Sequence, residues 1–324
     1  MDEKKAAFWL ASVPGIGQAK CRALLAVFHS PQAVYEADTA ALEKVDKLRP
    51  KDIRSIALSK NPEEIEQAWE KCQKQKIHFV WQGEKEYPTK LRQVYDAPFG
   101  LYYKGSLPAE DRPVLAVVGA RNASYKSCQL AYRMGKELAE NGVAVVSGLA
   151  RGIDIGAQKG VLSVAAGKTY GVMGCGIDIC YPREHIEPYT LMQRHGGIVS
   201  EYPPGVAPRP GNFPMRNRLI SAFSDGILVI EAGRGSGSLI TAEVGLEQGK
   251  DIFVVPGGVF DRSFEGSNQL IQNGAALVTK TKDILDGLGL FLDEDVSERK
   301  KKSEFCLATT EKTLYDRLSL EPIH

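Results

Sequence analysis

The feature that most constrains the fold of this chain is an alternation of short apolar runs and helical stretches between residues 114 and 278. Runs rich in Val and Ile have the length of buried strands and lie at 114–118, 143–146, 169–173, 198–200, 227–230, 252–255 and 276–278. Helical patterns separate them at 125–141, 154–166, 216–224, 239–248 and 268–273. Strands with few polar interruptions, joined through helices, favour a parallel sheet covered on both faces. We therefore predict an α/β, doubly wound, Rossmann-like domain over residues 83–290.

Residues 1–82 have a different pattern. Their apolar residues recur at helical intervals, which predicts a small all-helical domain. Within it, Gly15 and Gly17 flank an apolar residue in a hairpin between two short helices, the pattern of a helix-hairpin-helix motif. The amides of such a hairpin and Lys20, at the start of the second helix, are a possible phosphate contact. A tight helix connection without a ligand explains the same residues equally well.

The last segment, residues 291–324, is strongly charged at first. An acidic run at 293–295 and a basic run at 299–302 indicate a solvated linker. A further helical pattern follows at 311–318 and ends too soon to form a core.

Composition excludes several classes of protein. The chain has 41 Lys and Arg against 40 Asp and Glu, so it is no histone-like polycation, and any surface for nucleic acid must be local. Its 6 Cys form no Cys-x-x-Cys pair and its 5 His are scattered, so we expect no metal site and no cofactor. Reduced cysteines favour a cytoplasmic protein. The chain also lacks an apolar stretch of membrane-spanning length, a P-loop, a Gly-x-Gly-x-x-Gly turn after the first strand and a Gly-x-Ser-x-Gly turn.

Four turns rich in small residues come directly after predicted strands, at 119–122, 147–154, 174–178 and 233–238. The carboxyl ends of parallel strands gather such turns along one edge of the sheet. Free amides, helix N-termini and hydroxyl groups at that edge favour phosphate oxygens. The candidate binding residues are Gly119, Arg121, Asn122, Ser147, Gly148, Arg151, Arg183, Arg216, Asn217, Arg218, Ser236, Gly237, Ser238 and Thr241.

Charge is distributed unevenly over the predicted sheet. Residues 119–218 contain 12 Lys and Arg against 7 Asp and Glu, whereas residues 219–286 contain 5 against 9. Arginines in the basic half suit phosphate and can stack on bases, and Tyr181, Tyr202 and Phe213 are candidate stacking residues. Alternatively, some of the arginines form structural ion pairs with acidic residues, for which the candidates are Asp154, Glu201 and Glu231.

Seven motifs in order make the sequence resemble a known family. They are Gly-Ala-Arg at 119–121, Ser-Gly-Leu-Ala-Arg-Gly-Ile-Asp at 147–154, Gly-Ile-Asp with Tyr-Pro at 176–182, Ser-Glu-Tyr-Pro at 200–203, Phe-Pro-Met-Arg-Asn-Arg-Leu-Ile at 213–220, Ser-Gly-Ser-Leu-Ile-Thr-Ala at 236–242 and Val-Pro-Gly at 255–257. Together they closely resemble the bacterial DNA-processing protein A family, called DprA or Smf. The resemblance covers residues 1–290.

The resemblance implies a sterile-alpha-motif-like helical domain followed by an extended Rossmann-like domain. It further implies cooperative binding of single-stranded DNA, a homodimer formed through the Rossmann-like domain, and loading of RecA onto incoming DNA during natural transformation, without catalysis. A single-stranded DNA-binding protein is a further possible partner. Carried over by motif, Arg121 and Arg183 would contact DNA. Many members end in a winged-helix domain, and residues 311–324 resemble its truncated start.

Two other functions stay open at this point. Phosphoribohydrolases share a related fold, and Glu231, between a strand and the Gly-Ser turn, could be a catalytic carboxylate in such an enzyme. The Pro-Gly-Gly-x-Gly-Thr signature of those enzymes is interrupted after Gly258, which weakens this alternative. The other alternative is a protein adaptor that retains an unused ligand groove.

Overall fold

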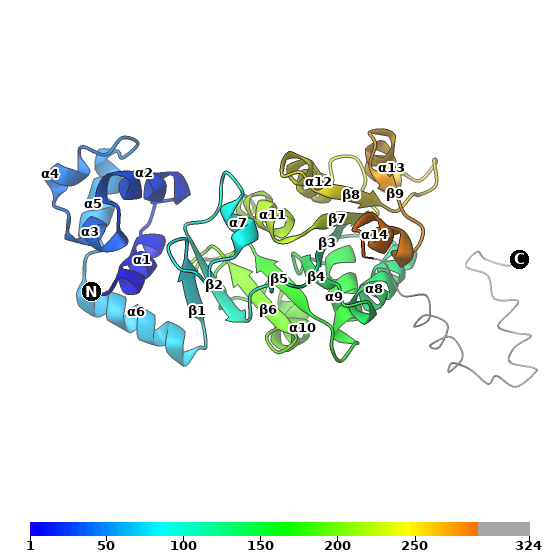
Figure 1. Cartoon of the computed structure of the whole chain (residues 1–324), viewed down its shortest axis with the longest axis horizontal. Helices are drawn as coiled ribbons and strands as arrows, with labels where there is room; N and C mark the ends of the chain where they lie inside the picture. The colour runs from blue at the N-terminus through cyan, green and yellow to red at the C-terminus, as the bar shows by residue number, and fades with distance from the viewer. Residues whose placement is uncertain (291–324) are drawn as a thin grey trace, which may run out of the picture. The chain divides into compact units, whose positions relative to one another are not determined.

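The computed structural model describes residues 1–290 and places a nine-stranded sheet at its centre (Figure 1). The strand order is β1-β2-β6-β5-β4-β3-β7-β8-β9. The seven predicted strands are confirmed as β3 (Val114–Gly119), β4 (Ala144–Ser147), β5 (Thr169–Met173), β6 (Gly196–Ser200), β7 (Gly226–Ile230), β8 (Asp251–Val254) and β9 (Ala276–Leu277). These seven are parallel to one another, so the predicted α/β, mostly parallel sheet is confirmed.

Two further strands extend one side of the sheet. β1 (His78–Trp81) pairs antiparallel with β2 (Gly100–Gly105), and β2 pairs antiparallel with β6. The prediction that residues 1–82 are entirely helical is therefore wrong over the last few residues of that range. β1 lies at the sheet edge and its exposed and buried positions do not continue the helical spacing that precedes it.

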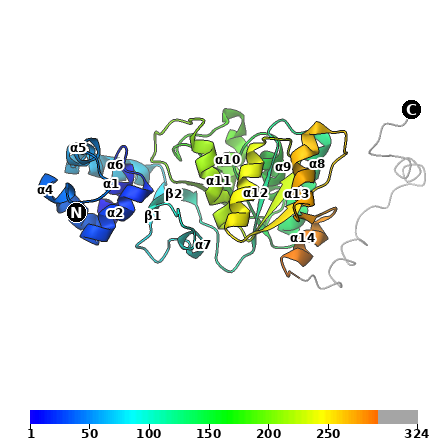
Figure 2. The ribbon, with the colours of Figure 1, turned by 90° about the horizontal axis from the view of Figure 1, so that it is seen from above.

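Helices cover both faces of the sheet (Figures 1 and 2). One face carries α8 (Tyr125–Glu140), α9 (Ile153–Leu162) and α10 (Ile186–Met192), and the other carries α7 (Thr89–Arg92), α11 (Asn212–Phe223), α12 (Gly237–Glu247) and α13 (Glu265–Gln272). The central strands are buried along nearly their whole length, because both of their faces pack against helices. α14 (Thr281–Gly287) follows β9.

Six helices precede the sheet: α1 (Glu3–Ser12), α2 (Gln18–Phe28), α3 (Pro31–Glu36), α4 (Thr39–Leu42), α5 (Pro50–Leu58) and α6 (Pro62–Lys74). They share a hydrophobic core with the antiparallel strands. The Phe8 ring of α1 lies 5.5 Å from the Phe79 ring of β1 and 5.9 Å from the Tyr102 ring of β2, both edge-on. Residues 1–284 form one compact unit, and a domain boundary at residue 82 stays a prediction.

The predicted linker and winged-helix start at 291–324 lie outside the described residues. Among the helices of residues 1–290, none is long and apolar enough to cross a membrane.

Candidate ligand site at the carboxyl edge of the sheet

The order of the strands reverses at β3. This strand pairs with β4 on one side and with β7 on the other, so the loops that follow β3 and β7 lead to opposite faces of the sheet. Such a reversal leaves a crevice at the carboxyl ends of the strands, where open α/β sheets bind ligands. A pocket of about 550 Å³ occupies this place. Nine predicted binding residues line it: Gly119, Arg121, Asn122, Arg216, Asn217, Ser236, Gly237, Ser238 and Thr241.

The turn after β3 forms one wall of this pocket. A Cβ atom on Gly119 would lie 2.0 Å from the carbonyl oxygen of Ile230, so only glycine fits between β3 and the end of β7. The turn then exposes Arg121 and Asn122 to solvent. Ser124 caps α8, and its hydroxyl accepts a hydrogen bond from the amide of Ser127 at 3.2 Å. The β3 turn therefore presents an exposed guanidinium group beside a capped helix.

Glu231 lies at the bottom of the pocket, directly after β7, and is 1% exposed. Its backbone has a left-handed φ of 51°. Its carboxylate accepts hydrogen bonds from the Ser124 amide at 2.9 and 3.0 Å and from the Ser124 hydroxyl at 2.7 Å. The same residue's carbonyl accepts a bond from the Ala120 amide at 2.8 Å. Glu231 thus joins the end of β7 to the start of α8, and nothing in this arrangement favours the hydrolase alternative.

The loop between β7 and α12 forms the opposite wall. Ser236 caps α12: its hydroxyl accepts the Ser238 amide at 3.5 Å, and its carbonyl oxygen accepts the Leu239 amide at 3.0 Å. This end of the helix favours an anion. Arg234, which is exposed, and Ser263 also line the pocket. Neither was among the predicted site residues, although Arg234 lies inside the Gly-Ser turn that marked the site.

Arg216 of α11 lies beneath the pocket and is 3% exposed. Its guanidinium donates to the carbonyl oxygens of Gly148, at 2.8 Å, and Val172. Burial lowers the pKa of Arg216 to about 10, so the side chain is still cationic at neutral pH. A Cβ on Gly148 would lie 2.5 Å from this guanidinium, which explains the glycine there. Asp154 is buried nearby, accepts the Gly148 amide at 3.1 Å and has its pKa raised by burial.

A second, smaller cleft of about 40 Å³ adjoins the pocket and shares Arg121 and Arg216 with it. Two further predicted residues, Gly148 and Arg151, line this cleft. Phe213 contacts both shared arginines, with its ring centre 5.5 Å from the guanidinium carbon of Arg121 and 5.9 Å from that of Arg216. Cation–π contacts of this kind favour a fixed orientation of both arginines. The cleft thereby continues the cationic surface towards the β5 side of the sheet.

The other candidate stacking residues and arginines differ in their exposure and contacts. Tyr181 is 42% exposed and its ring is 5.4 Å from that of Phe213. Tyr202 is half-buried, and burial raises its pKa to about 12. The guanidinium Nε of Arg151 lies 2.5 Å from the carboxylate of Glu184. Arg183 is exposed and lines neither the pocket nor the cleft, although the preceding residue, Pro182, lines the cleft.

Two predicted site residues have structural roles instead. Ser147 is fully buried, and its hydroxyl donates to the carbonyl oxygen of Val117 at 2.6 Å, so it fastens β4 to β3. Arg218 is 6% exposed. Its Nε lies 3.0 Å from the carboxylate of Asp96, and another nitrogen donates to the carboxylate of Glu201. The prediction that these two residues contact a ligand is wrong, while the alternative of an Arg218–Glu201 ion pair is confirmed.

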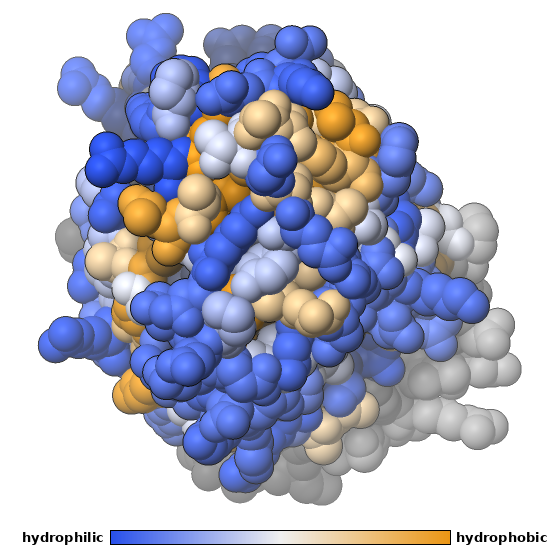
Figure 3. All heavy atoms as spheres, turned by 90° about the vertical axis from the view of Figure 1, so that its left-hand side faces the viewer, coloured by the Kyte–Doolittle hydropathy of each residue, from blue (hydrophilic) through white to orange (hydrophobic). Residues whose placement is uncertain are grey.

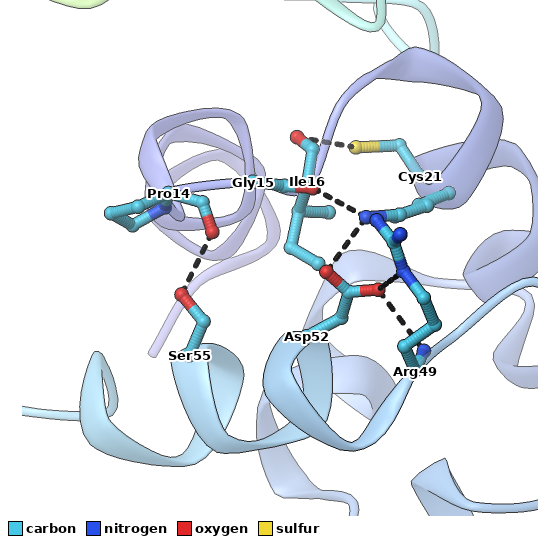
Figure 4. Close-up of polar contacts among 8 residues, drawn as sticks. Pro14, Gly15, Ile16, Cys21, Arg49, Asp52 and Ser55 are labelled. Atoms are coloured by element: carbon cyan, nitrogen blue, oxygen red, sulfur yellow. Dashed lines mark hydrogen bonds and ion pairs between the residues drawn. The ribbon is translucent and has the colours of Figure 1, made fainter.

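The helix-hairpin-helix residues are also engaged internally (Figure 4). Lys20 donates to the carbonyl oxygen of Gly15 and to the carboxylate of Asp52, both at 2.7 Å. The Asp52 side chain is 3% exposed and also accepts the Arg49 amide at 3.0 Å. The bond from Lys20 is the first cause that lowers the pKa of Asp52 to about 2. Asp52 thus neutralises Lys20 in this structure, and a phosphate contact at Gly15, Gly17 and Lys20 stays a prediction.

The face formed by the N-terminal helices is largely hydrophilic, with separate apolar areas (Figure 3). A groove of about 470 Å³ runs between α4 and α5 and is lined by Thr39, Glu43, Leu48, Pro50, Ile53, Arg54 and Ala57. It has none of the glycine-rich turns that surround the pocket at the sheet edge.

Known proteins resemble the chain over most of its length. A family model described as DNA recombination-mediator protein A matches residues 78–289. The DNA processing protein DprA of Streptococcus pneumoniae is 41% identical over 199 residues, 61% of this chain and 70% of that protein. The protein Smf of Synechocystis is 32% identical over 307 residues, 93% of this chain and 77% of that protein.

Two solved structures are similar in fold and sequence. The crystal structure of the Streptococcus pneumoniae protein DprA has a TM-score of 0.77 and 31% identity, and the match covers 88% of this chain and 98% of that one. A structure of DNA processing protein A from Helicobacter pylori, which addresses its single-stranded DNA binding mode, has a TM-score of 0.59 and 30% identity. That match covers 65% of this chain and 95% of the other.

Proposed function

Because this chain belongs to the family of DNA recombination-mediator protein A, also named DprA or Smf, we propose that it binds single-stranded DNA along the carboxyl edge of its sheet. The observation that carries the proposal is the pocket at the strand reversal, where Arg121 and Arg234 are exposed beside the N-terminus of α12. A solvent-exposed guanidinium and the positive end of a helix dipole favour phosphate oxygens rather than a particular base.

The proposed binding site consists of the pocket, the adjoining cleft and Arg183. Arg121 lines both the pocket and the adjoining cleft, so a sugar-phosphate chain that passes from one to the other would contact this residue on the way. Arg183 is exposed next to the cleft and would extend the cationic track. Arg151, which is exposed in the cleft, would contribute by exchanging its ion pair with Glu184 for a phosphate. Arg216 would act from below, through the shape of the backbone that it holds. Binding of this kind is tolerant of sequence and weakens as salt increases.

We further propose that this protein protects incoming DNA and loads RecA onto it during natural transformation, as a homodimer formed through the Rossmann-like domain. This part rests on family membership. A dimer would bring two such binding sites, one at the sheet edge of each protomer, to a single DNA strand and raise the avidity for longer DNA. The proposal contains no chemical step, and the carboxylate of Glu231, which binds Ser124, is assigned to the scaffold.

The experiment is a salt titration of binding to single- and double-stranded oligonucleotides of one sequence. We expect a preference for the single strand and a fall in affinity with added salt. Arg121→Ala together with Arg183→Ala should weaken binding at least tenfold and reduce the dependence on salt by about two phosphate contacts. Both side chains are exposed, so the unfolding midpoint should stay unchanged. Unaltered affinity in a folded double variant would contradict the proposed site and favour the adaptor alternative.

A further inference from the structure

The loop between β8 and α13 carries two large apolar side chains in full contact with solvent. Phe260 is 99% exposed and Val259 is 84% exposed. Among the large apolar side chains of residues 1–290, Phe260 is the most exposed, Tyr95 follows at 89%, and Val259 is third. A phenylalanine in this position forgoes the stabilisation that burial of its ring would give. Packing within the described chain therefore does not explain its place at the tip of the loop.

The base of this loop is firmly held, although its tip is not packed. The side-chain amide of Asn268 both donates to the carbonyl oxygen of Gly257 and accepts its amide, each at 3.1 Å. The amide of Asp261 donates to Gly258 at 3.0 Å, and the Asp261 carboxylate accepts the Ser263 amide at 2.9 Å. A turn closed by these bonds presents Phe260 in a defined position, which lowers the ordering cost of a contact there.

The same loop lies against the wall of the ligand pocket. Ser263 lines the pocket, and a Cβ on Gly233, another lining residue, would lie 3.2 Å from the carbonyl oxygen of Arg262. α13 is fastened to the same wall, because the Ala232 amide donates to the Ser267 hydroxyl at 2.8 Å. Arg262 is exposed two residues from Phe260. The pocket rim thus continues into a surface where an arginine and a bare aromatic ring lie close together in the chain.

We propose that Phe260 is a base-stacking residue, on which one unpaired base rests while the adjoining sugar-phosphate chain follows Arg262 and Arg234 into the pocket. Every base has a flat aromatic face, so an exposed ring beside cations binds a single strand without reading its sequence. A paired base does not offer that face, and the ring therefore favours single-stranded over double-stranded DNA. The assignment rests on the proposed function and adds a contact outside the glycine-rich turns.

The test compares two ligands of equal charge and length: an oligothymidylate and an oligomer of abasic sites. Phe260→Ala should weaken binding of oligothymidylate by about 5- to 150-fold, the range for loss of one stacked base. Its affinity for the abasic oligomer and its salt dependence should equal those of the wild type, because the phosphate contacts are retained. Phe260→Trp should restore binding, and its fluorescence should be quenched by oligothymidylate only.

The matched control is Tyr95→Ala, which removes an exposed aromatic ring from the loop between α7 and β2, beside Arg22 of α2. It should leave both affinities unchanged. The stacking assignment would be overturned if Phe260→Ala bound oligothymidylate with the affinity of the wild type. It would also be overturned if the variant lost affinity equally for both ligands, or if only its sedimentation, and neither affinity, changed. Either of these last two results would favour a protein contact at Phe260. If the wild-type protein fails to bind oligothymidylate at all, the proposed function itself is wrong.

Discussion

The variant Arg218→Met tests whether this arginine has a structural role and does not contact a ligand. Its side chain is 7% exposed and bridges Glu201, at 16%, and Asp96, at 44%. Removing one partner of a buried ion pair costs about 3–5 kcal/mol. Because Asp96 remains well solvated and only Glu201 loses a buried partner, we expect the lower end, about 3 kcal/mol. For a chain of this size that lowers the unfolding midpoint by about 4–5 °C.

The loss of stability should depend on pH, in a direction set by Glu201. Burial raises the pKa of this carboxyl, and Arg218 opposes the rise. Without the arginine the pKa rises further, so the ionised form becomes more costly to bury. That cost is present above the new pKa and disappears as the pH falls through it and Glu201 takes up a proton. The midpoints of variant and wild type should therefore approach each other on acidification from neutral pH.

The assay is thermal unfolding at neutral and mildly acidic pH, combined with binding of oligothymidylate at a temperature below both midpoints. Affinity should be retained, because Arg218 lines neither hollow of the site. Adding Glu201→Gln should recover most of the lost stability, since no uncompensated buried charge remains. A variant with the midpoint of the wild type and a tenfold weaker affinity would refute this reasoning and restore Arg218 as a DNA contact.

Two other substitutions test the scaffold. Gly119→Ala puts a methyl group 2.0 Å from the Ile230 carbonyl oxygen. It should lower the free energy of unfolding, measured with urea, by at least about 2 kcal/mol. An unchanged urea midpoint would contradict the close approach of β3 and β7. Asp52→Asn removes a carboxyl whose pKa is about 2 in the folded protein, so the stability it contributes is present above its ordinary pKa and is lost as the pH falls towards 2. The variant should be less stable than the wild type at pH 7 and lose less on acidification; equal curves would show that the Lys20 contact contributes nothing.

The central sheet could be predicted because its strands are buried on both faces and their sequences show it as continuous apolar runs. β1 and β2 do not follow that rule. β1 has four residues and is exposed at its first, and β2 ends in half-buried and exposed residues. Both are antiparallel strands at the side of the sheet, where β1 pairs with β2 and β2 pairs with β6, and neither belongs to a strand-helix repeat. Their pairing is a tertiary property, which local periodicity does not contain.

The site was predicted in outline for a similar reason. Once the strands are parallel, the turns after them must gather at one edge, and the glycine-rich sequences mark those turns. What each arginine does there depends on its neighbours in space. Arg216 and Arg218 are two residues apart on α11, yet one binds carbonyl oxygens at the end of β5 and after β4, and the other binds carboxylates near α7 and β6. No spacing in the sequence distinguishes these two roles.

Under the proposed function, the two kinds of arginine have separate tasks in the binding of a polyanion by a chain whose net charge is only +1. Arg216 donates its hydrogen bonds to the carbonyl oxygens of Gly148, after β4, and Val172, in β5, and so fixes the backbone beneath the pocket. Arg121 and Arg234 are exposed on the two walls above it, with their charge available to a ligand. Since the rigid part carries the geometry and the exposed part carries the free charge, loss of an exposed arginine should weaken binding without unfolding the protein. Loss of Arg216 should do both, because the pocket would no longer keep its shape.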